Sequence, residues 1–137
     1  MERNFDEVLA NRLYVGSAAS AEQAIDEQLV TSVFDVRVKG RQEAVPYSYT
    51  HSPIEEQNEA STIKHGAERI ATQIAAGQSV YIHCGSGTGR AAVMAAATLM
   101  ELGQCPSIDE AIEAIQEKRT GANFKPNMVE ALRSLYK

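Results

Sequence analysis

Short runs of apolar residues alternate along the chain with segments in which apolar residues recur at helical spacing. The runs rich in β-branched and aromatic residues predict strands at residues 13–15, 31–36 and 79–83, and SYTH at 48–51 is a further candidate strand. The periodic segments predict helices at residues 21–29, 62–76, 90–102, 108–119 and 127–135. Strands that alternate with helices indicate an α/β fold, in which a short, mainly parallel central sheet carries helices on both faces.

Helix starts are marked by side chains that accept hydrogen bonds from free backbone N–H groups. Ser20 and Ser61 precede two of the predicted helices, and Ser107 with Glu110 three residues later forms a capping-box pattern before another. No internal repeat, low-complexity tract or Gly/Ser/Pro linker divides the chain, and 137 residues fit one domain. We therefore expect a single domain over residues 1–137.

Composition narrows the class of protein. Apolar residues make up 44% of the chain and charged residues 23%, which is ordinary for a globular protein. The formal charge of −5 argues against a binder of nucleic acid or anionic membranes. The N-terminus lacks the apolar run of a secretory signal, the most apolar stretch (91–100) is too short to span a bilayer, and two cysteines make no disulfide framework. We expect a monomeric, cytoplasmic protein that binds neither nucleic acid nor membranes.

One predicted strand leads into a glycine-rich loop and then a helix. Cys84 opens the loop, Gly85, Gly87 and Gly89 follow at alternate positions, and Arg90 begins the helix. Glycine reaches backbone angles that are closed to other residues, so successive N–H groups can turn inward around an anion. The helix N-terminus adds unpaired N–H groups, and a guanidinium can hold two phosphate oxygens at once. The loop therefore predicts an oxyanion site.

A cysteine in such a loop differs from an ordinary thiol. Helix N-termini and nearby cations favour the thiolate, which is the nucleophilic form. Cys84 would face the phosphorus atom of an ester bound in the loop. Its attack would give a covalent thiophosphate and divide one difficult hydrolysis into two easier steps.

These residues carry a family resemblance. The pattern His83-Cys84-x-x-Gly87-x-x-Arg90 resembles the Cys-x5-Arg phosphate loop of cysteine-dependent protein tyrosine phosphatases, and the short chain resembles their dual-specificity branch. The resemblance implies hydrolysis of phosphotyrosine or other phosphate monoesters through a phosphocysteine, with no cofactor or metal. It gives His83 a supporting role through hydrogen bonds to the backbone around the cysteine. The residues it implies for binding phosphate, sulfate or vanadate are Gly85, Ser86, Gly87, Thr88, Gly89 and Arg90.

The segment before the helix at 62–76 resembles the part of that family that carries the general acid. Glu56 falls where the family has Asp, and it is one methylene longer. A glutamic acid can still protonate a leaving oxygen, so Glu56 is the predicted acid, with Glu55 and Asp35 as rivals. Arg119 and the segment 125–127 resemble the closing part of the family's domain.

A second departure follows the arginine of the loop. The family has Ser or Thr there, and its hydroxyl assists breakdown of the phosphoenzyme, whereas this chain has Ala91. We expect slow breakdown, or a partial substitute in Ser86 or Thr88. The loop carries no lysine, which favours phosphotyrosine or another singly phosphorylated ester over a polyanionic lipid.

Other interpretations stay open. A rhodanese-like sulfurtransferase also uses a cysteine in an anion-binding loop, although the spacing of Cys84 and Arg90 favours phosphate, and Ala91 keeps a phosphate-binding pseudophosphatase open. Cys105 is predicted as a packing residue, with redox pairing to Cys84 as the alternative. The basic residues of the segment 37–41 lie either on the rim of the site or in a solvated loop.

Overall fold

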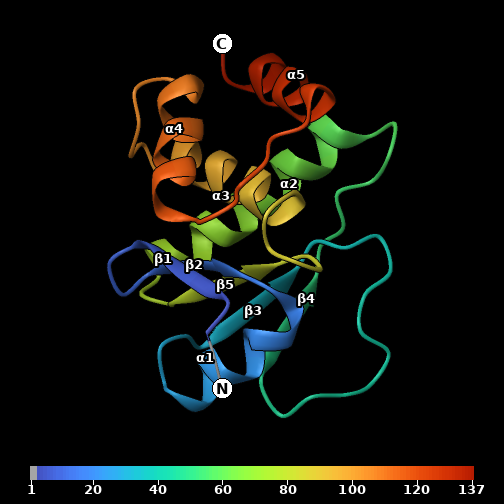
Figure 1. The fold of residues 1–137 in the computed structure, drawn as a ribbon, viewed down its shortest axis with the longest axis vertical. Helices are drawn as coiled ribbons and strands as arrows, with labels where there is room; N and C mark the ends of the chain where they lie inside the picture. Colours follow the sequence, from blue (N-terminus) through green and yellow to red (C-terminus); the bar gives the residue numbers. More distant parts are fainter. Residues whose placement is uncertain (1–2) are drawn as a thin grey trace.

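One five-stranded sheet forms the centre of the computed structural model, which describes residues 3–137 (Figure 1). The strand order is β1-β2-β5-β3-β4. Only the pairing of β1 with β2 is antiparallel, because the other neighbours run in parallel. The strands are β1 (Phe5–Leu9), β2 (Leu13–Gly16), β3 (Ser32–Asp35), β4 (Ser48–His51) and β5 (Val80–His83).

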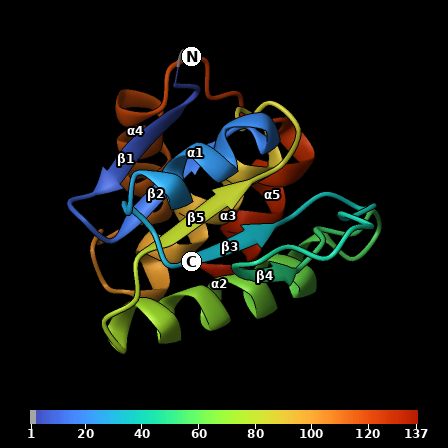
Figure 2. The same ribbon diagram turned by 90° about the horizontal axis from the view of Figure 1, so that it is seen from below.

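Helices cover both faces of this sheet, which confirms the predicted α/β fold. One face carries α1, whereas α2 to α5 lie on the other (Figure 1). Seen from the α1 side, strands β2, β5, β3 and β4 lie side by side with α3 behind them (Figure 2). The helices are α1 (Ala21–Asp26), α2 (Glu59–Ala75), α3 (Arg90–Glu101), α4 (Ile108–Lys118) and α5 (Pro126–Leu135).

Small side chains let α3 pack closely against the sheet. Residues 91–99 of this helix are all buried, and five of them are alanine. Together with β5 they form the centre of the larger apolar core, to which α2, α4 and α5 contribute. A smaller cluster, which includes Phe5, Val33 and Tyr81, lies on the α1 side. The core therefore fixes α3 against β5, the two elements that flank the glycine-rich loop.

The strand register aligns the carboxyl ends of the parallel strands. Gly16 and Asp35 both pair with His83, and Asp35 also pairs with His51. Ligand sites in parallel α/β sheets form beyond these strand ends. The loop that begins at Cys84 leaves the sheet at this edge.

Some element boundaries differ from the prediction. Helix α2 begins three residues earlier than expected, after Asn58, and the Ser61 hydroxyl donates to the Asn58 carbonyl instead of capping the helix. Ser20 makes no side-chain cap for α1, because it ends a 3-10 turn that Ser17 caps. Ser107 does cap α4, since its oxygen accepts from the Glu110 N–H. None of the helices within residues 3–137 combines the length and apolarity needed to cross a membrane.

Candidate active site

The loop between β5 and α3 turns sharply at Gly87. This residue has a φ of 81°, and a Cβ atom there would lie 2.3 Å from the carbonyl carbon and oxygen of Gly16. No side chain fits at that position. Gly85 and Gly89 have no atom within 4 Å of such a Cβ and have negative φ, so of the three glycines only Gly87 is required by space. The loop therefore packs its backbone directly on the end of β2.

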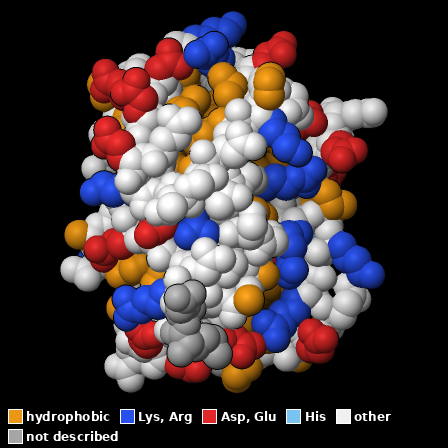
Figure 3. Space-filling view, viewed as in Figure 1, with side chains coloured by type: hydrophobic (Ala, Val, Ile, Leu, Met, Phe, Trp, Pro, Cys, Tyr) orange, Lys and Arg blue, Asp and Glu red, His pale blue; other side chains and the backbone are white. Residues whose placement is uncertain are grey.

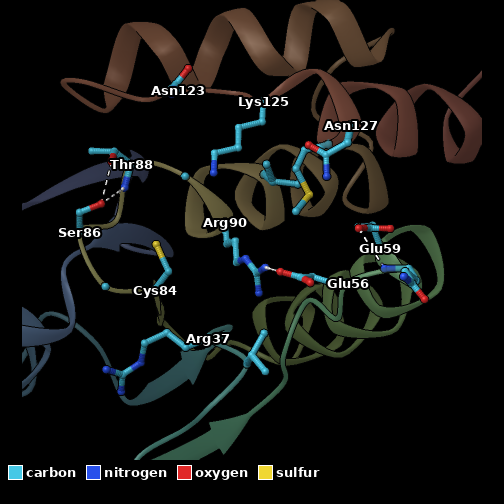
Figure 4. A pocket seen from close by; sticks show the side chains of 16 residues that line it. Arg37, Glu56, Glu59, Cys84, Ser86, Thr88, Arg90, Asn123, Lys125 and Asn127 are labelled. Atoms are coloured by element: carbon cyan, nitrogen blue, oxygen red, sulfur yellow. Dashed lines mark hydrogen bonds and ion pairs between the residues drawn. The ribbon is translucent and has the colours of Figure 1, made fainter.

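Cys84 lines a cavity of about 890 Å³. Its side chain is buried, and the Gly87 N–H donates to its sulfur at 3.3 Å. A donor directed at the sulfur stabilises negative charge on it. The cavity is lined by Arg37, Val38, Glu56, Gln57, Glu59, Cys84, Gly85, Ser86, Thr88, Gly89, Arg90, Val93, Asn123, Lys125, Asn127 and Met128 (Figure 4).

Arg90 connects the start of α3 to the segment before α2. Its Nη1 donates to the Ile54 carbonyl at 2.7 Å, and its Nη2 lies 3.8 Å from Glu56 Oε1 (Figure 4). Both contacts restrict the guanidinium, whose side chain is 26% exposed. The structure thus brings the predicted phosphate-binding arginine and the predicted acid to one cavity with Cys84.

The predicted general acid, Glu56, and its two rivals occupy different environments. The Glu56 side chain is 82% exposed and lines the cavity. Glu55 is exposed but is absent from the lining, as is Asp35. Asp35 is fully buried, and it accepts hydrogen bonds from the Arg37 side chain and from the Tyr49 hydroxyl. Of the three, only Glu56 faces the cavity.

The charge state of Asp35 also argues against its acting as the general acid. Burial by itself would raise the pKa of Asp35, but hydrogen bonds from Arg37 and Tyr49 outweigh burial and hold this pKa below its ordinary value. An ionised carboxylate has no proton to give. Asp35 instead fixes Arg37 at the edge of the cavity through two hydrogen bonds, of 3.0 and 2.8 Å.

Glu59 is a cavity residue that the sequence analysis missed. It stands in the first turn of α2, and its Oε2 accepts from the Gln57 N–H at 3.1 Å (Figure 4). Gln57 has a φ of 68°, a left-handed conformation that is uncommon outside glycine. Its N–H bond to Glu59 supports the turn that carries Glu56. A carboxylate at the start of a helix is a recognisable signal, but it does not distinguish a residue that faces a cavity from one that faces solvent.

His83 supports the loop from below. Its Nδ1 lies 3.0 Å from the Cys84 carbonyl oxygen, and the ring is buried. Burial lowers the pKa of His83, although the bond to Cys84 and the nearby Asp35 act in the opposite direction. Because a carbonyl oxygen can only accept, Nδ1 carries the proton and donates to it. The structure thus shows a contact between His83 and the backbone at the cysteine, and the supporting role of His83 stays a prediction.

Arg119 holds the outer side of the same loop. Its guanidinium is 3% exposed, and it donates to the carbonyls of Ser86 and Gly87 at 2.8 and 3.1 Å. Two residues near the N-terminus, Asn4 and Asp6, accept its remaining hydrogen bonds. The sequence placed Arg119 only within a closing segment, since the pattern of the chain gives no sign of this contact.

The remaining predicted residues are placed as follows. The hydroxyls of Ser86 and Thr88 lie 2.8 Å apart, and Ala91 is fully buried at the start of α3. Cys105 is a partly buried free cysteine, and burial raises its pKa. The basic residues of the segment 37–41 occupy two environments. Arg37 lines the cavity, whereas Arg41 pairs with Glu22.

Within residues 3–137, no three or more His, Cys, Asp or Glu side chains lie together in an arrangement that could hold a metal ion.

Comparison with known proteins identifies the family. The family model described as dual specificity phosphatase, catalytic domain, matches residues 13–137. The chain belongs to this family. The matched region contains every residue that lines the cavity, whereas Asn4 and Asp6, which hold Arg119, lie before it.

Curated relatives of this dual specificity phosphatase domain match a part of it. The mouse protein named phosphatidylglycerophosphatase and protein-tyrosine phosphatase 1 is 41% identical over 63 residues, which is 46% of this chain and 32% of that protein. The human protein of the same name is 36% identical over 61 residues, 44% of this chain and 30% of that one. The match thus spans about a third of the length of the curated relatives.

Solved structures share the fold along nearly the whole chain. Human DUSP28 superposes with a TM-score of 0.83 at 19% identity, over 98% of this chain and 94% of that one. Tk-PTP in its active form gives a TM-score of 0.80 at 23% identity, over 98% and 97%. PTPMT1 in complex with PI(5)P gives 0.78 at 20% identity, over 96% and 93%. At these identities the likeness supports the fold.

Proposed function

We propose that this domain hydrolyses phosphate monoesters through a phosphocysteine intermediate on Cys84. The observation that carries the proposal is the meeting of three groups in one cavity. These are the Cys84 sulfur with an N–H donor at 3.3 Å, the N-terminus of α3, and the Arg90 guanidinium. A nucleophile beside an anion-binding helix terminus and a cation suits attack on a phosphoryl group. Membership of the dual specificity phosphatase family supports this chemistry over sulfur transfer.

In the first step the Cys84 thiolate attacks phosphorus. An S–P bond forms and the bond from phosphorus to the leaving oxygen breaks, while Arg90 and the loop N–H groups hold the other phosphoryl oxygens. Glu56 gives its proton to the leaving oxygen, which departs as an alcohol or phenol. Its place 3.8 Å from Arg90 Nη2 puts the acid beside the cation that binds the phosphate.

In the second step water attacks the phosphocysteine. Glu56, now ionised, takes a proton from the water, an O–P bond forms, and the S–P bond breaks to return the thiolate and inorganic phosphate. His83 keeps the Cys84 carbonyl in place during both steps. Ala91 supplies no hydroxyl to assist departure of the sulfur, so we infer that this second step is the slower one.

The substrate is a protein phosphotyrosine or another phosphate monoester. The name of the curated relatives joins a lipid phosphatase with a protein-tyrosine phosphatase, and both are substrate types to test here. The side chains of the loop itself are neutral, which favours esters with one phosphate in the loop. We also infer that the domain acts as a monomer in the cytoplasm.

A trapping experiment tests the covalent step. The purified protein is mixed with phenyl phosphate and quenched within milliseconds, and mass spectrometry of its peptides should detect a phosphoryl group on Cys84. Cys84→Ser should lose turnover but keep vanadate binding, whereas Cys105→Ser serves as the matched control with both retained. Wild-type protein that binds vanadate without turnover or a trapped phosphoryl group would identify a pseudophosphatase. Transfer of sulfur from thiosulfate without phosphatase activity would identify a sulfurtransferase.

A further inference from the structure

The cavity is much larger than a phosphoryl group. Its volume of about 890 Å³ lies in the range of pockets that enclose an entire small molecule. The phosphate loop occupies one part of its lining, and Val93 and Met128 add apolar surface. The rest of the lining therefore contacts the part of the substrate that leaves.

Three cationic side chains line this cavity, and two of them already have a role. Arg37 forms a bidentate pair with the buried Asp35, and Arg90 is the proposed partner of the phosphate in the loop. Lys125 is exposed, and within residues 3–137 no carboxylate lies at ion-pair distance from it. Its ammonium group points from the segment before α5 toward the phosphate loop (Figure 4). Among the described residues that line the cavity, Lys125 is thus the cation available to a second anionic group.

The backbone that carries Lys125 is fixed to the loop. The Asn123 N–H donates to the Thr88 carbonyl at 2.7 Å, and the Lys125 carbonyl accepts from the N–H groups of Met128 and Val129 at the start of α5. Asn123 and Asn127 line the cavity on either side of Lys125 (Figure 4). This wall of the cavity therefore carries the Lys125 cation between two residues with amide side chains.

Charge divides the cavity into two parts. Glu56 and Glu59 lie together at the end toward α2, whereas Lys125 lies over the phosphate loop (Figure 4). On the molecular surface, Lys and Arg side chains gather in a band on the right half of the face seen in Figure 3. An anionic group of a substrate is therefore attracted to the Lys125 side and repelled from the other end.

We propose that Lys125 is a specificity-determining residue that selects phosphate monoesters whose leaving group carries a second anionic group. The inference rests on the proposed phosphatase function and goes beyond it in naming a substrate class. The monoester phosphate occupies the loop at Cys84, and the second anion, a carboxylate or a phosphodiester, is bound by the Lys125 ammonium.

Two matched esters test the proposal. 3-Carboxyphenyl phosphate carries the second anion, and 3-carbamoylphenyl phosphate is nearly the same in shape but lacks the charge. We measure kcat/KM for both in the wild type, Lys125→Met, Lys125→Glu and the control Lys118→Met, which removes the same charge from α4 away from the cavity. Because every protein is measured on the same two esters, the intrinsic reactivity of the esters cancels when the proteins are compared.

The ratio of kcat/KM for the anionic ester to that for the neutral ester should fall roughly five-fold in Lys125→Met, as expected for a partly exposed ion pair. The ratio should fall further in Lys125→Glu and keep its wild-type value in Lys118→Met. At high salt, which screens the charges, the ratio should no longer depend on Lys125. An unchanged ratio in Lys125→Met, or an equal fall in Lys118→Met, would overturn the proposal. Hydrolysis of neither ester by the wild type would instead overturn the phosphatase function itself.

A second pair of esters distinguishes the sources of the anion. One arm compares two phosphotyrosine peptides, one with Asp and one with Asn beside the phosphotyrosine. The other compares glycerol phosphates with and without a phosphodiester on the adjacent hydroxyl. The arm with the larger Lys125-dependent ratio identifies the source, and a ratio independent of Lys125 in both arms counts against the proposal.

Discussion

Arg119 and Cys84 contact opposite sides of one peptide group. Arg119 Nη2 donates to the Ser86 carbonyl at 2.8 Å, and the N–H of the same peptide, on Gly87, donates to the Cys84 sulfur at 3.3 Å. The carbonyl and N–H of a trans peptide point in opposite directions. A buried guanidinium on the outside of the loop therefore fixes the direction of a donor on the inside.

Arg119→Lys should disturb the loop because an ammonium cannot hold both carbonyls and Asp6 in the same geometry. We expect kcat/KM to fall on the order of 10- to 100-fold, the cost of a small misplacement of reacting groups. Vanadate affinity should fall with it, measured on protein that circular dichroism shows to be folded. Arg133→Lys, at an exposed pair with Asp109, serves as control. Wild-type vanadate affinity in folded Arg119→Lys would reduce Arg119 to a purely stabilising residue.

The parts of the fold with strong local patterns were predictable from sequence. The run at 79–83 and the glycines after it predicted β5 and the loop, because an apolar β-branched segment and a sharp turn leave clear signatures. Strand β1 was missed, since FDEVL at a sheet edge carries two charged residues and pairs antiparallel with β2. The Arg119 contact was missed because it joins residues more than 30 positions apart. Such contacts depend on tertiary packing, which no local pattern encodes.

Arg90→Lys tests the phosphate-binding role. A lysine provides a point charge in place of a planar fork, and it would also lose the bond from Nη1 to the Ile54 carbonyl. We expect a loss in kcat/KM on the order of 100-fold or more, comparable with the removal of a principal transition-state donor. Steady-state kinetics with phenyl phosphate measure it, and Arg69→Lys on the exposed surface of α2 is the control. If the variant stays within a few-fold of wild type, Arg90 only begins the helix.

His83 should make stability depend on pH. Burial lowers the pKa of His83, so the folded state keeps the ring neutral where the unfolded chain already binds a proton. The free energy of unfolding should therefore fall as the pH falls through about 6.5, the ordinary value for histidine. Thermal unfolding between pH 8 and pH 5.5 measures this slope. It should be shallower in His83→Gln and unchanged in His65→Gln, which alters an exposed ring on α2; equal slopes in all three proteins would assign the fall to other groups.

Ala91→Ser tests whether breakdown of the phosphoenzyme limits turnover. Ala91 is fully buried at the first turn of α3, directly behind the loop. If breakdown is slow because no hydroxyl follows Arg90, the serine should raise kcat and shrink the pre-steady-state burst of phenol. Stopped-flow kinetics with an activated aryl phosphate measure both. A wild type without a burst, with kcat unchanged by the serine, would show that another step limits the rate.

Glu56→Gln tests the proposed general acid through its dependence on the leaving group. Protonation by a positioned acid contributes on the order of 10²–10⁴-fold. The variant should therefore lose most of its kcat with phenyl phosphate, whose leaving group is poor, and far less with 4-nitrophenyl phosphate, whose leaving group needs no proton. The basic limb of the pH–rate profile should also flatten, because that limb reports loss of the acid's proton.

Parallel variants decide between Glu56 and its neighbours. Glu55→Gln, one position away and outside the cavity lining, is the matched control and should keep wild-type values for both esters. Asp35→Asn should affect the two esters equally, since Asp35 acts by holding Arg37 and has no proton to donate. If Glu55→Gln shows the leaving-group dependence and Glu56→Gln does not, the acid is the neighbouring residue. If none of the three shows it, the leaving oxygen takes its proton from water, and Glu56 serves only as a partner of Arg90.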